Sequence, residues 1–110
     1  MTGRWRDVGA ADELADGGRI EADLDGIWVA VVRVGDELYA FEDRCTHDGQ
    51  SLAGGELERD AATGAGVVVC PRHGARFCLA TGAPLCPPAY EPLRRFEVRR
   101  TGGRIEVLEP

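Results

Sequence analysis

Over most of the chain, apolar residues alternate with polar ones or stand in short runs, and both patterns indicate β-strands. Arg19–Leu24 alternates strictly between charged and apolar residues, which predicts a half-buried strand. Asp25-Gly26 then supplies the two residues of a tight hairpin turn. Ile27–Val34 follows as a mostly β-branched run that contains Trp28, and this is typical of a central strand covered on both faces.

The same patterns predict seven further strands and no helix of ordinary length. These strands cover residues 4–8, 38–41, 56–58, 67–69, 77–79, 93–99 and 105–108. Residues 12–14 are expected to form one helical turn, and residues 59–66 an exposed turn. The elements therefore predict an all-β fold with antiparallel strands. Four aromatic residues in the strands are predicted to pack in the core: Trp28, Tyr39, Phe41 and Phe96.

Length and composition fit one domain spanning residues 1–110. No apolar run approaches the roughly 18 residues that a membrane helix needs, and the first residues do not resemble a signal peptide. We therefore expect a cytoplasmic protein without membrane association. In that compartment the four cysteines are expected to be metal ligands or free thiols, not disulfides.

The net charge of −6 is unevenly distributed. Residues 1–60 carry 15 acidic residues against 6 arginines, whereas residues 61–110 carry 4 against 7. A sequence pI of about 4.8 does not suit a nucleic-acid partner. The acidic half could steer association with a basic protein surface, or it could simply be a solvated surface.

Two short motifs concentrate the chemistry. Cys45-Thr46-His47 and Cys70-Pro71-Arg72-His73 each offer one thiol and one imidazole, and 22 residues separate His47 from Cys70. Both motifs follow a predicted strand, and both are followed closely by a glycine. They contain both histidines of the chain and half of its cysteines. Such a set at strand ends indicates a four-ligand metal site.

Three kinds of chemistry use these residue types. A tetrahedral zinc ion accepts two sulfurs and two nitrogens, although its usual sites pair cysteine with cysteine and histidine with histidine. A [2Fe–2S] cluster with one iron bound by two cysteines and the other by two histidines explains why each loop mixes the two types. A Cys–His nucleophilic pair leaves the duplicated arrangement unexplained. The mixed loops thus favour the cluster over zinc.

The segments Cys45-Thr46-His47-Asp48-Gly49 and Cys70-Pro71-Arg72-His73-Gly74-Ala75-Arg76-Phe77 resemble the two cluster-binding loops of Rieske proteins. The remaining chain is similar to the Rieske-type ferredoxins of bacterial ring-hydroxylating dioxygenase systems. The resemblance implies an antiparallel β-sandwich with a small cluster-binding part at about residues 43–90. It implies that Cys45 and Cys70 bind one iron and that His47 and His73 bind the other. It also implies that Pro87-Pro88 covers the cluster from a third side.

The chain departs from the high-potential members of that family. They place a cysteine in each loop where this chain has Gln50 and Arg72, and they place a serine and a tyrosine where it has Ala75 and Phe77. Hydrogen bonds from such hydroxyls stabilise the reduced cluster. We therefore predict a potential at the low end of the Rieske range, about −150 mV. The spacing between the loops is a few residues longer than expected for the ferredoxins, and the extra residues are predicted to lie in the turn at residues 59–66.

The resemblance implies a one-electron carrier, monomeric on its own and without substrate chemistry. It would take electrons from a flavin-containing ferredoxin reductase and pass them to a terminal non-haem iron oxygenase. One alternative is a small redox subunit of another enzyme, such as a nitrite reductase. Another is a zinc-stabilised binding module without a redox role. Cys78 and Cys86 are placed outside the site, with Cys78 expected to be a small buried residue.

Overall fold

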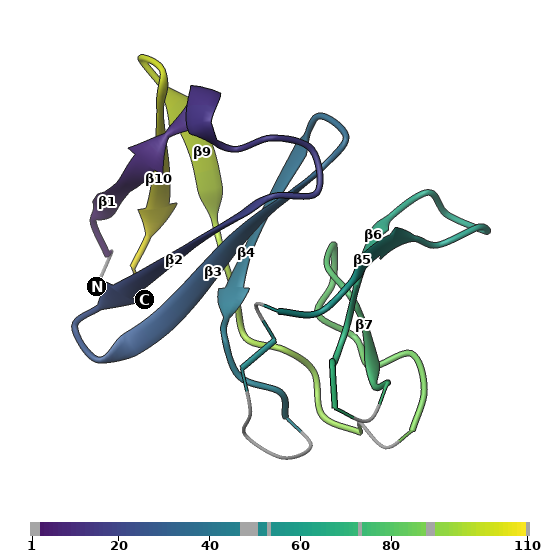
Figure 1. Ribbon diagram of the computed structural model, residues 1–110. Coiled ribbons are helices and arrows are strands. Elements are labelled where there is room, and N and C mark those ends of the chain that lie inside the picture. The colour runs from purple at the N-terminus through teal and green to yellow at the C-terminus, as the bar shows by residue number, and fades with distance from the viewer. Residues whose placement is uncertain (1–2, 47–50, 53, 73, 88–89, 110) are drawn as a thin grey trace.

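The computed structural model describes residues 3–46, 51–52, 54–72, 74–87 and 90–109, and these residues form three antiparallel sheets (Figure 1). The first sheet has the order β1-β10-β9, the second β2-β3-β4-β8 and the third β5-β6-β7. The strands are β1 Trp5–Ala10, β2 Arg19–Leu24, β3 Ile27–Val34, β4 Glu37–Glu42, β5 Leu57–Arg59, β6 Gly66–Val69, β7 Arg76–Cys78, β8 Arg95–Phe96, β9 Val98–Thr101 and β10 Arg104–Leu108.

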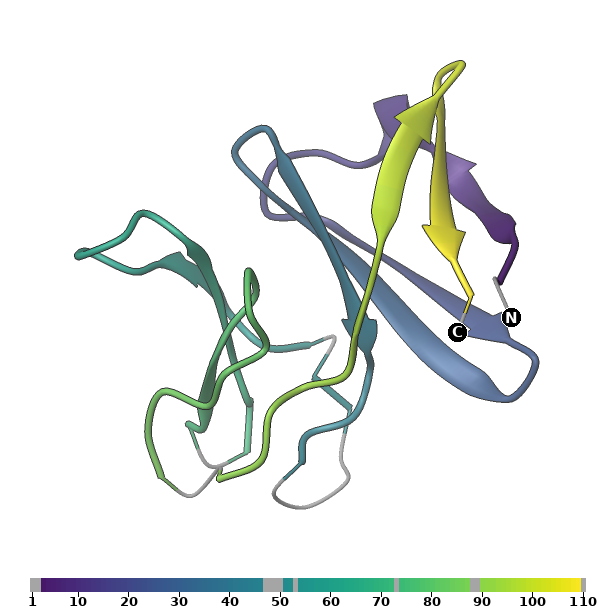
Figure 2. The ribbon, with the colours of Figure 1, turned by 180° about the vertical axis from the view of Figure 1, so that it is seen from behind.

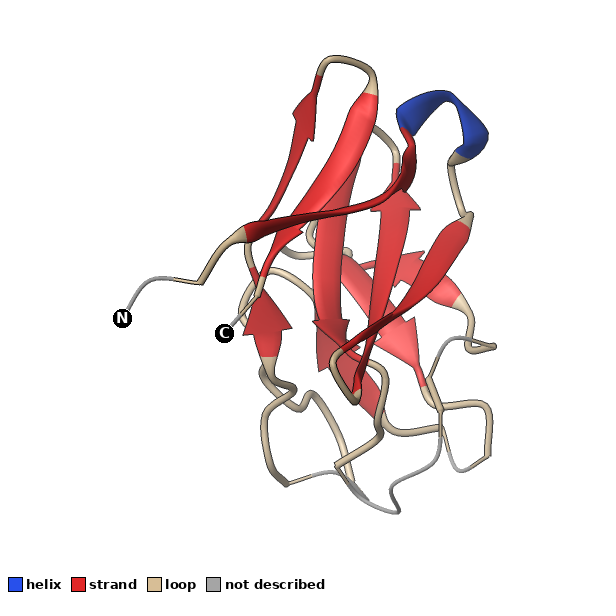
Figure 3. Cartoon of the chain, turned by 90° about the vertical axis from the view of Figure 1, so that its left-hand side faces the viewer, coloured by secondary structure: helices blue, strands red, loops and turns tan. Residues whose placement is uncertain are grey.

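The predicted all-β antiparallel fold is confirmed. In the described part of the chain, the only helical element is a single 3-10 turn at Ala11–Glu13, close to the turn predicted at residues 12–14 (Figure 3). None of the helical structure described is long and apolar enough to cross a membrane.

The hairpin of β2 and β3 has the bounds and the turn that the sequence predicts. Asp25 and Gly26 have φ angles of 56° and 94°, so both central residues of the turn lie in the left-handed region. That is the backbone of a type I′ turn, whose twist matches the right-handed twist of the two strands. The turn fixes the register, in which Asp23 pairs with Trp28. The strand β4 continues the meander and ends three residues before Cys45.

The strand β3 is buried on both faces, which explains its nearly continuous apolar run. On one face it packs toward the sheet of β1, β10 and β9. That core contains Leu14, Leu24, Val29, Val31, Ala40, Phe96, Ile105 and Val107. On the other face it packs toward the sheet of β5, β6 and β7. That second core contains Ala30, Val32, Val34, Tyr39, Phe41, Cys45, Leu52, Val68, Cys70, Ala75, Phe77, Leu79 and Leu93.

The prediction that Trp28 packs in the core is wrong, because its side chain is 56% exposed. Trp28 lies at the start of β3, two residues before Ala30, and so points to the same face of the sheet as the second core. Its register partner on β2 is the exposed Asp23. At this end of the hairpin the face of the sheet is therefore not covered. The predictions for Tyr39, Phe41 and Phe96 are confirmed, since all three are buried.

The single strand predicted at residues 93–99 is wrong in its extent. The segment forms two strands, β8 and β9, separated by Glu97. The strand β8 pairs with β4, whereas β9 pairs with β10, so the chain passes from one sheet to another at this point (Figure 2). Alternation along the sequence shows that residues are extended, but not which neighbouring strand they pair with.

The hairpin of β5 and β6 ends in an exposed turn at residues 60–65, far from the end of the sheet where β6 leads into Cys70 (Figure 1). The carboxylate of Asp60 accepts hydrogen bonds from the Ala62 amide at 3.1 Å and from the Thr63 hydroxyl at 3.1 Å. The Gly64 amide donates to the Asp60 carbonyl at 2.8 Å. The turn is therefore closed by contacts within itself.

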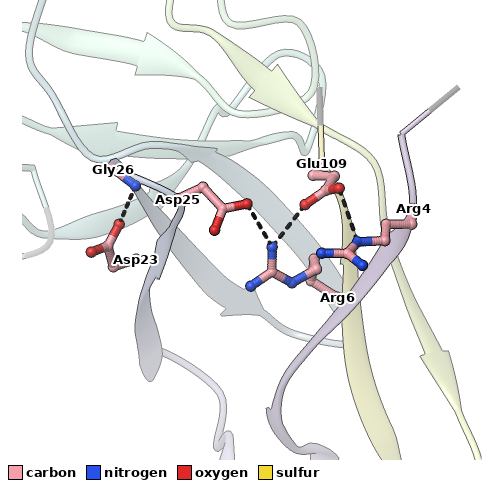
Figure 4. A network of polar contacts seen from close by, with 6 residues as sticks. All are labelled: Arg4, Arg6, Asp23, Asp25, Gly26 and Glu109. Atoms are coloured by element: carbon pink, nitrogen blue, oxygen red, sulfur yellow. Dashed lines mark hydrogen bonds and ion pairs between the residues drawn. The ribbon is translucent and has the colours of Figure 1, made fainter. Parts of the chain in front are cut away.

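Ion pairs fasten the N-terminal strand to the C-terminal one. Arg6 donates to Glu109 at 2.8 Å and to Asp25 of the β2–β3 turn at 3.1 Å (Figure 4). The hydrogen bond from Arg6 holds the pKa of the Glu109 carboxyl below its ordinary value. The bidentate contact from Arg104 does the same for the pKa of Asp7. The Arg104–Asp7 pair is exposed and contributes little to stability, whereas the Arg6–Glu109 pair is partly buried.

The contrast between two leucines tests the assignment of the second core. Replacing Leu79, which is 2% exposed, by alanine should lower the free energy of unfolding by about 2–5 kcal/mol, because the change leaves a cavity in a packed core. The matched variant Leu85→Ala removes the same atoms from a side chain that is 44% exposed, and should change it by about 0.5 kcal/mol. Urea unfolding followed by circular dichroism measures both. Equal midpoints for the two variants would contradict this description of the core.

Candidate metal centre

Two buried thiols belong to the second core. Cys45 comes three residues after β4 ends, and Cys70 immediately follows β6. They are 0% and 1% exposed, and both belong to the apolar cluster that contains Phe77. The loops that follow β4 and β6 lie at the same end of the molecule (Figures 1 and 2). The structure thus brings the two predicted cysteine ligands into one buried apolar environment.

The two predicted histidine ligands, His47 and His73, lie outside the described residues. Among the described residues, no three histidine, cysteine or acidic side chains form a group that could hold a metal ion. The structure therefore shows the sulfur half of the predicted donor set, and His47 and His73 stay predictions from the sequence.

Asp43 closes the base of the first ligand loop. One oxygen of its carboxylate accepts the Leu52 amide at 2.7 Å, and the other accepts the Ser51 hydroxyl at 2.8 Å. Its own amide donates to the Trp28 carbonyl at 2.8 Å. One side chain thereby joins the end of β4 to the residues on the far side of the loop. The sequence analysis did not predict this role. The position of an acidic residue shortly before Cys45 and Ser51 is only weak evidence for a loop-closing contact.

The second ligand loop is a tight turn closed by its own backbone. The Cys70 amide donates to the Ala75 carbonyl at 2.7 Å, and the Gly74 amide donates to the Cys70 carbonyl at 3.0 Å. Gly74 has a φ of 73°, a conformation that side chains disfavour, which explains the glycine after the histidine. The chain leaving the first loop also passes close to this turn. A Cβ at Gly55 would lie 1.9 Å from the carbonyl oxygen of Val69, so only glycine fits there.

Residues 84–87 and 90–91 are fastened to both ligand loops. The Thr46 hydroxyl of the first loop donates to the Glu91 carbonyl at 2.7 Å. On the side of the second loop, the Cys86 thiol donates to the Gly74 carbonyl at 3.7 Å. The Leu85 amide also donates to the Arg76 carbonyl at 2.7 Å. The segment is thus tied to both loops.

The sequence predicted a third segment from Pro87-Pro88, of which Pro88 lies outside the described residues. It did not predict that Thr46 and Cys86 hold this segment in place. A threonine inside a ligand motif and a cysteine before two prolines look like unrelated residues until the fold brings their partners close.

The other two cysteines are separate from the ligand pair. Cys78 and Cys86 are both partly exposed, so Cys78 is not the small buried residue that the sequence predicts. Burial raises the pKa of the Cys78 thiol. The Thr81 hydroxyl and the amides of Thr81 and Ala80 outweigh that effect, so the pKa lies below its ordinary value. Cys78 is partly exposed because side chains alternate along an extended chain, and its neighbours Phe77 and Leu79 are the ones that point into the second core.

The surroundings of the two buried thiols contain no hydroxyl at the positions singled out from the sequence. Ala75 and Phe77 are both fully buried in the same cluster as Cys45 and Cys70. Neither side chain can donate a hydrogen bond to a sulfur.

Comparison with known proteins agrees with this arrangement. The model of the Rieske [2Fe-2S] domain matches residues 4–97. The 3-phenylpropionate/cinnamic acid dioxygenase ferredoxin subunit of Escherichia coli (strain K12) is 45% identical over 82 residues, which are 74% of this chain and 73% of that protein.

Two solved structures have the same fold. One is a chain from the complex of reduced oxygenase and oxidised ferredoxin in carbazole 1,9a-dioxygenase, with a TM-score of 0.84 and 39% identity over 94% of this chain and 92% of that one. The other is the putative NADH-dependent nitrite reductase small subunit from Mycobacterium tuberculosis. It has a TM-score of 0.86 and 25% identity over 100% of this chain and 97% of that one.

The chain therefore belongs to the Rieske [2Fe-2S] domain family. Its cofactor is one Rieske-type [2Fe–2S] cluster, and its role is electron transfer, not catalysis. The buried thiols of Cys45 and Cys70 suit such a group, because thiolates bind iron and the apolar cluster around them excludes water. Zinc binding without a redox role is not favoured.

Asp43 offers a test of how the first loop is held. Asp43→Ala would leave the buried Leu52 amide without its carboxylate partner, which typically costs about 1–3 kcal/mol. We expect the variant to lose its cluster at a lower temperature than the wild type, followed as bleaching of the visible absorption. Asp43→Asn keeps one oxygen acceptor and should recover part of the loss. If Asp43→Ala bleaches at the wild-type temperature, the carboxylate does not hold the loop.

The missing hydroxyls predict the reduction potential. The wild type should have a potential at the low end of the Rieske range, about −150 mV. Ala75→Ser and Phe77→Tyr should each raise it, by up to about 100 mV for a hydrogen bond that strengthens on reduction. Phe96→Tyr, in the core that lacks both thiols, is the matched control and should leave the potential unchanged. Protein-film voltammetry measures these potentials. A clearly positive potential of the wild type would contradict the prediction of a low potential.

Proposed function

We propose that this chain carries single electrons from a flavin-containing reductase to the terminal non-haem iron oxygenase of a ring-hydroxylating dioxygenase system. The observation that carries the proposal is the pair of buried thiols, Cys45 and Cys70, placed by β4 and β6 in one apolar cluster. The 45% identity to a dioxygenase ferredoxin subunit supports the same role. When bound, the cluster accepts one electron and returns it.

The proposed ligands are Cys45 and Cys70 for one iron and His47 and His73 for the other. The two cysteines suit this assignment because they are the fully buried pair, whereas Cys78 and Cys86 are partly exposed. Two neutral imidazoles in place of two thiolates make the site less negative, so it accepts an electron more readily than an all-thiolate site.

The rest of the chain's role is to hold these loops. Asp43 closes the first loop, and Cys86 and Glu91 contact the second and the first loop respectively, so we propose that these contacts restrict the motion of the site. We propose one domain, residues 1–110, in which about residues 43–90 bind the cluster. We also propose that the protein works as a monomer in the cytoplasm, where its thiols stay reduced.

The alternative of a nitrite-reductase-like small subunit is not favoured. The structure with that description is 25% identical to this chain, whereas the dioxygenase ferredoxin subunit is 45% identical. Similarity of fold alone does not choose between the two partners.

Serine variants of all four cysteines test the ligand assignment. Cys45→Ser and Cys70→Ser should each lose the cluster, seen as loss of iron, labile sulfide and visible absorption. Cys78→Ser and Cys86→Ser are matched controls and should keep about two irons per chain. His47→Ala and His73→Ala should lose the cluster or abolish its rhombic electron paramagnetic resonance signal in the reduced state. Loss of iron in the Cys78 variant with retention in the Cys45 variant would refute the assignment.

A coupling experiment tests the partner. The chain has no lysine, so a carbodiimide joins its carboxylates to lysines of a partner with little linking to itself. We expect the holoprotein to capture a terminal oxygenase from the source cells, and the reduced holoprotein to lose its electron to that oxygenase in stopped-flow mixing. Capture of a nitrite reductase catalytic subunit without any oxygenase would contradict the proposed function.

A further inference from the structure

An exposed hollow lies beside the first ligand loop. It has a volume of about 340 Å³ and is lined, among the described residues, by Glu21, Trp28, Asp43 and Ser51. Two of these residues, Asp43 and Ser51, belong to the hydrogen bonds that close the ligand loop. A group bound in the hollow would therefore lie directly against that loop.

The aromatic side of the hollow is accessible. Trp28 is 56% exposed, which is unusual for so large an apolar side chain, and in the described part of the chain no arginine stacks on its ring. The other tryptophan of the chain differs in this respect. Trp5 already has the guanidinium of Arg99 over its ring, 4.0 Å from the ring centroid. The face of Trp28 is therefore open to a cation.

The polar side of the hollow is acidic. Glu21 is exposed on β2 and has no hydrogen-bond or ion-pair partner among the described residues. Asp23, which is exposed on the same face and pairs in register with Trp28, adds negative charge next to the hollow without lining it, and its carboxylate accepts the Gly26 amide at 2.7 Å. Asp43 adds a second carboxylate to the lining, at the rim of the loop. Carboxylates around an open indole face make a site complementary to an arginine or lysine side chain.

Building on the proposed function, we propose that this hollow receives a basic side chain of the terminal oxygenase and so docks that partner against the first ligand loop. The choice of the oxygenase follows from the relative whose structure is a complex of ferredoxin with oxygenase. The reductase then has to use another surface or leave before the oxygenase binds. The uneven charge of the chain fits this arrangement, because the acidic residues 1–60 include Glu21, Asp23 and Asp43.

The test uses the holoprotein, its reductase and the oxygenase that the coupling experiment identifies. It measures reduction of the ferredoxin by the reductase and reduction of the oxygenase by the ferredoxin separately. Trp28→Ala and Glu21→Gln should each raise the KM for the ferredoxin in reduction of the oxygenase, by about fivefold or more for the tryptophan. The kcat and the rate of reduction by the reductase should not change. Trp28→Phe keeps an aromatic face and should restore most of the affinity. Asp36→Asn removes the same charge from a side chain that is 97% exposed at the β3–β4 turn, and is the matched control.

The dependence of the KM on ionic strength provides a second readout. A purely structural role of Glu21 would not produce such a dependence. The difference between wild type and Glu21→Gln should shrink as ionic strength rises, because salt screens exposed charges. Oxygenase kinetics unaffected by both variants, or a change confined to the reductase step, would overturn the docking proposal while leaving the proposed function intact. If Tyr90→Ala, at another exposed aromatic residue, raised the KM while the Trp28 variants did not, the hollow would also be ruled out. Failure of the wild type to reduce the oxygenase would instead refute the proposed function, and the docking proposal with it.

Discussion

The metal centre depends on keeping two thiols dry at the end of an apolar core. Cys45 and Cys70 are buried because both belong to the second of the two cores that β3 joins, among residues that are themselves buried. A buried thiolate is stable only with a partner of opposite charge, and in the proposed assignment the iron atoms of the cluster would be that partner. Fold and cofactor are therefore coupled, since the core supplies the burial and the cofactor supplies the charge that makes burial favourable.

Much of the fold could be predicted from the sequence because its local signals are strong. Arg19–Leu24, Asp25-Gly26 and Ile27–Val34 define a hairpin whose alternation and turn residues allow one register. The sheet change at Glu97 could not be predicted, because alternation continues through it. Trp28 was misjudged for a related reason, since its apolar character says nothing about whether another sheet reaches that end of β3.

In the candidate site, too, features set by local sequence could be predicted and features set by tertiary contacts could not. That Cys45 and Cys70 belong together could be predicted from motif and spacing, because cysteine and histidine at strand ends have few other uses, and the structure places both in one buried cluster. The contacts that hold the loops could not, because they depend on tertiary proximity. Thr46 donates to the carbonyl of Glu91, which is 45 residues away in the sequence. The backbone of Gly55 passes close to the Val69 carbonyl, and no local sequence pattern predicts that approach. Candidate ligand residues can be recognised from their type and spacing in the sequence. Residues such as Thr46 and Gly55, which act through tertiary contacts, cannot be recognised in that way.

The turn at residues 60–65 offers a practical handle on this molecule. It closes on itself through Asp60 and lies at the tip of a hairpin that points away from the ligand loops. A peptide inserted there would extend from the opposite end of that hairpin. The protein could thus be tethered to an electrode or an affinity resin with its redox end facing solution, in a defined orientation that random attachment does not give.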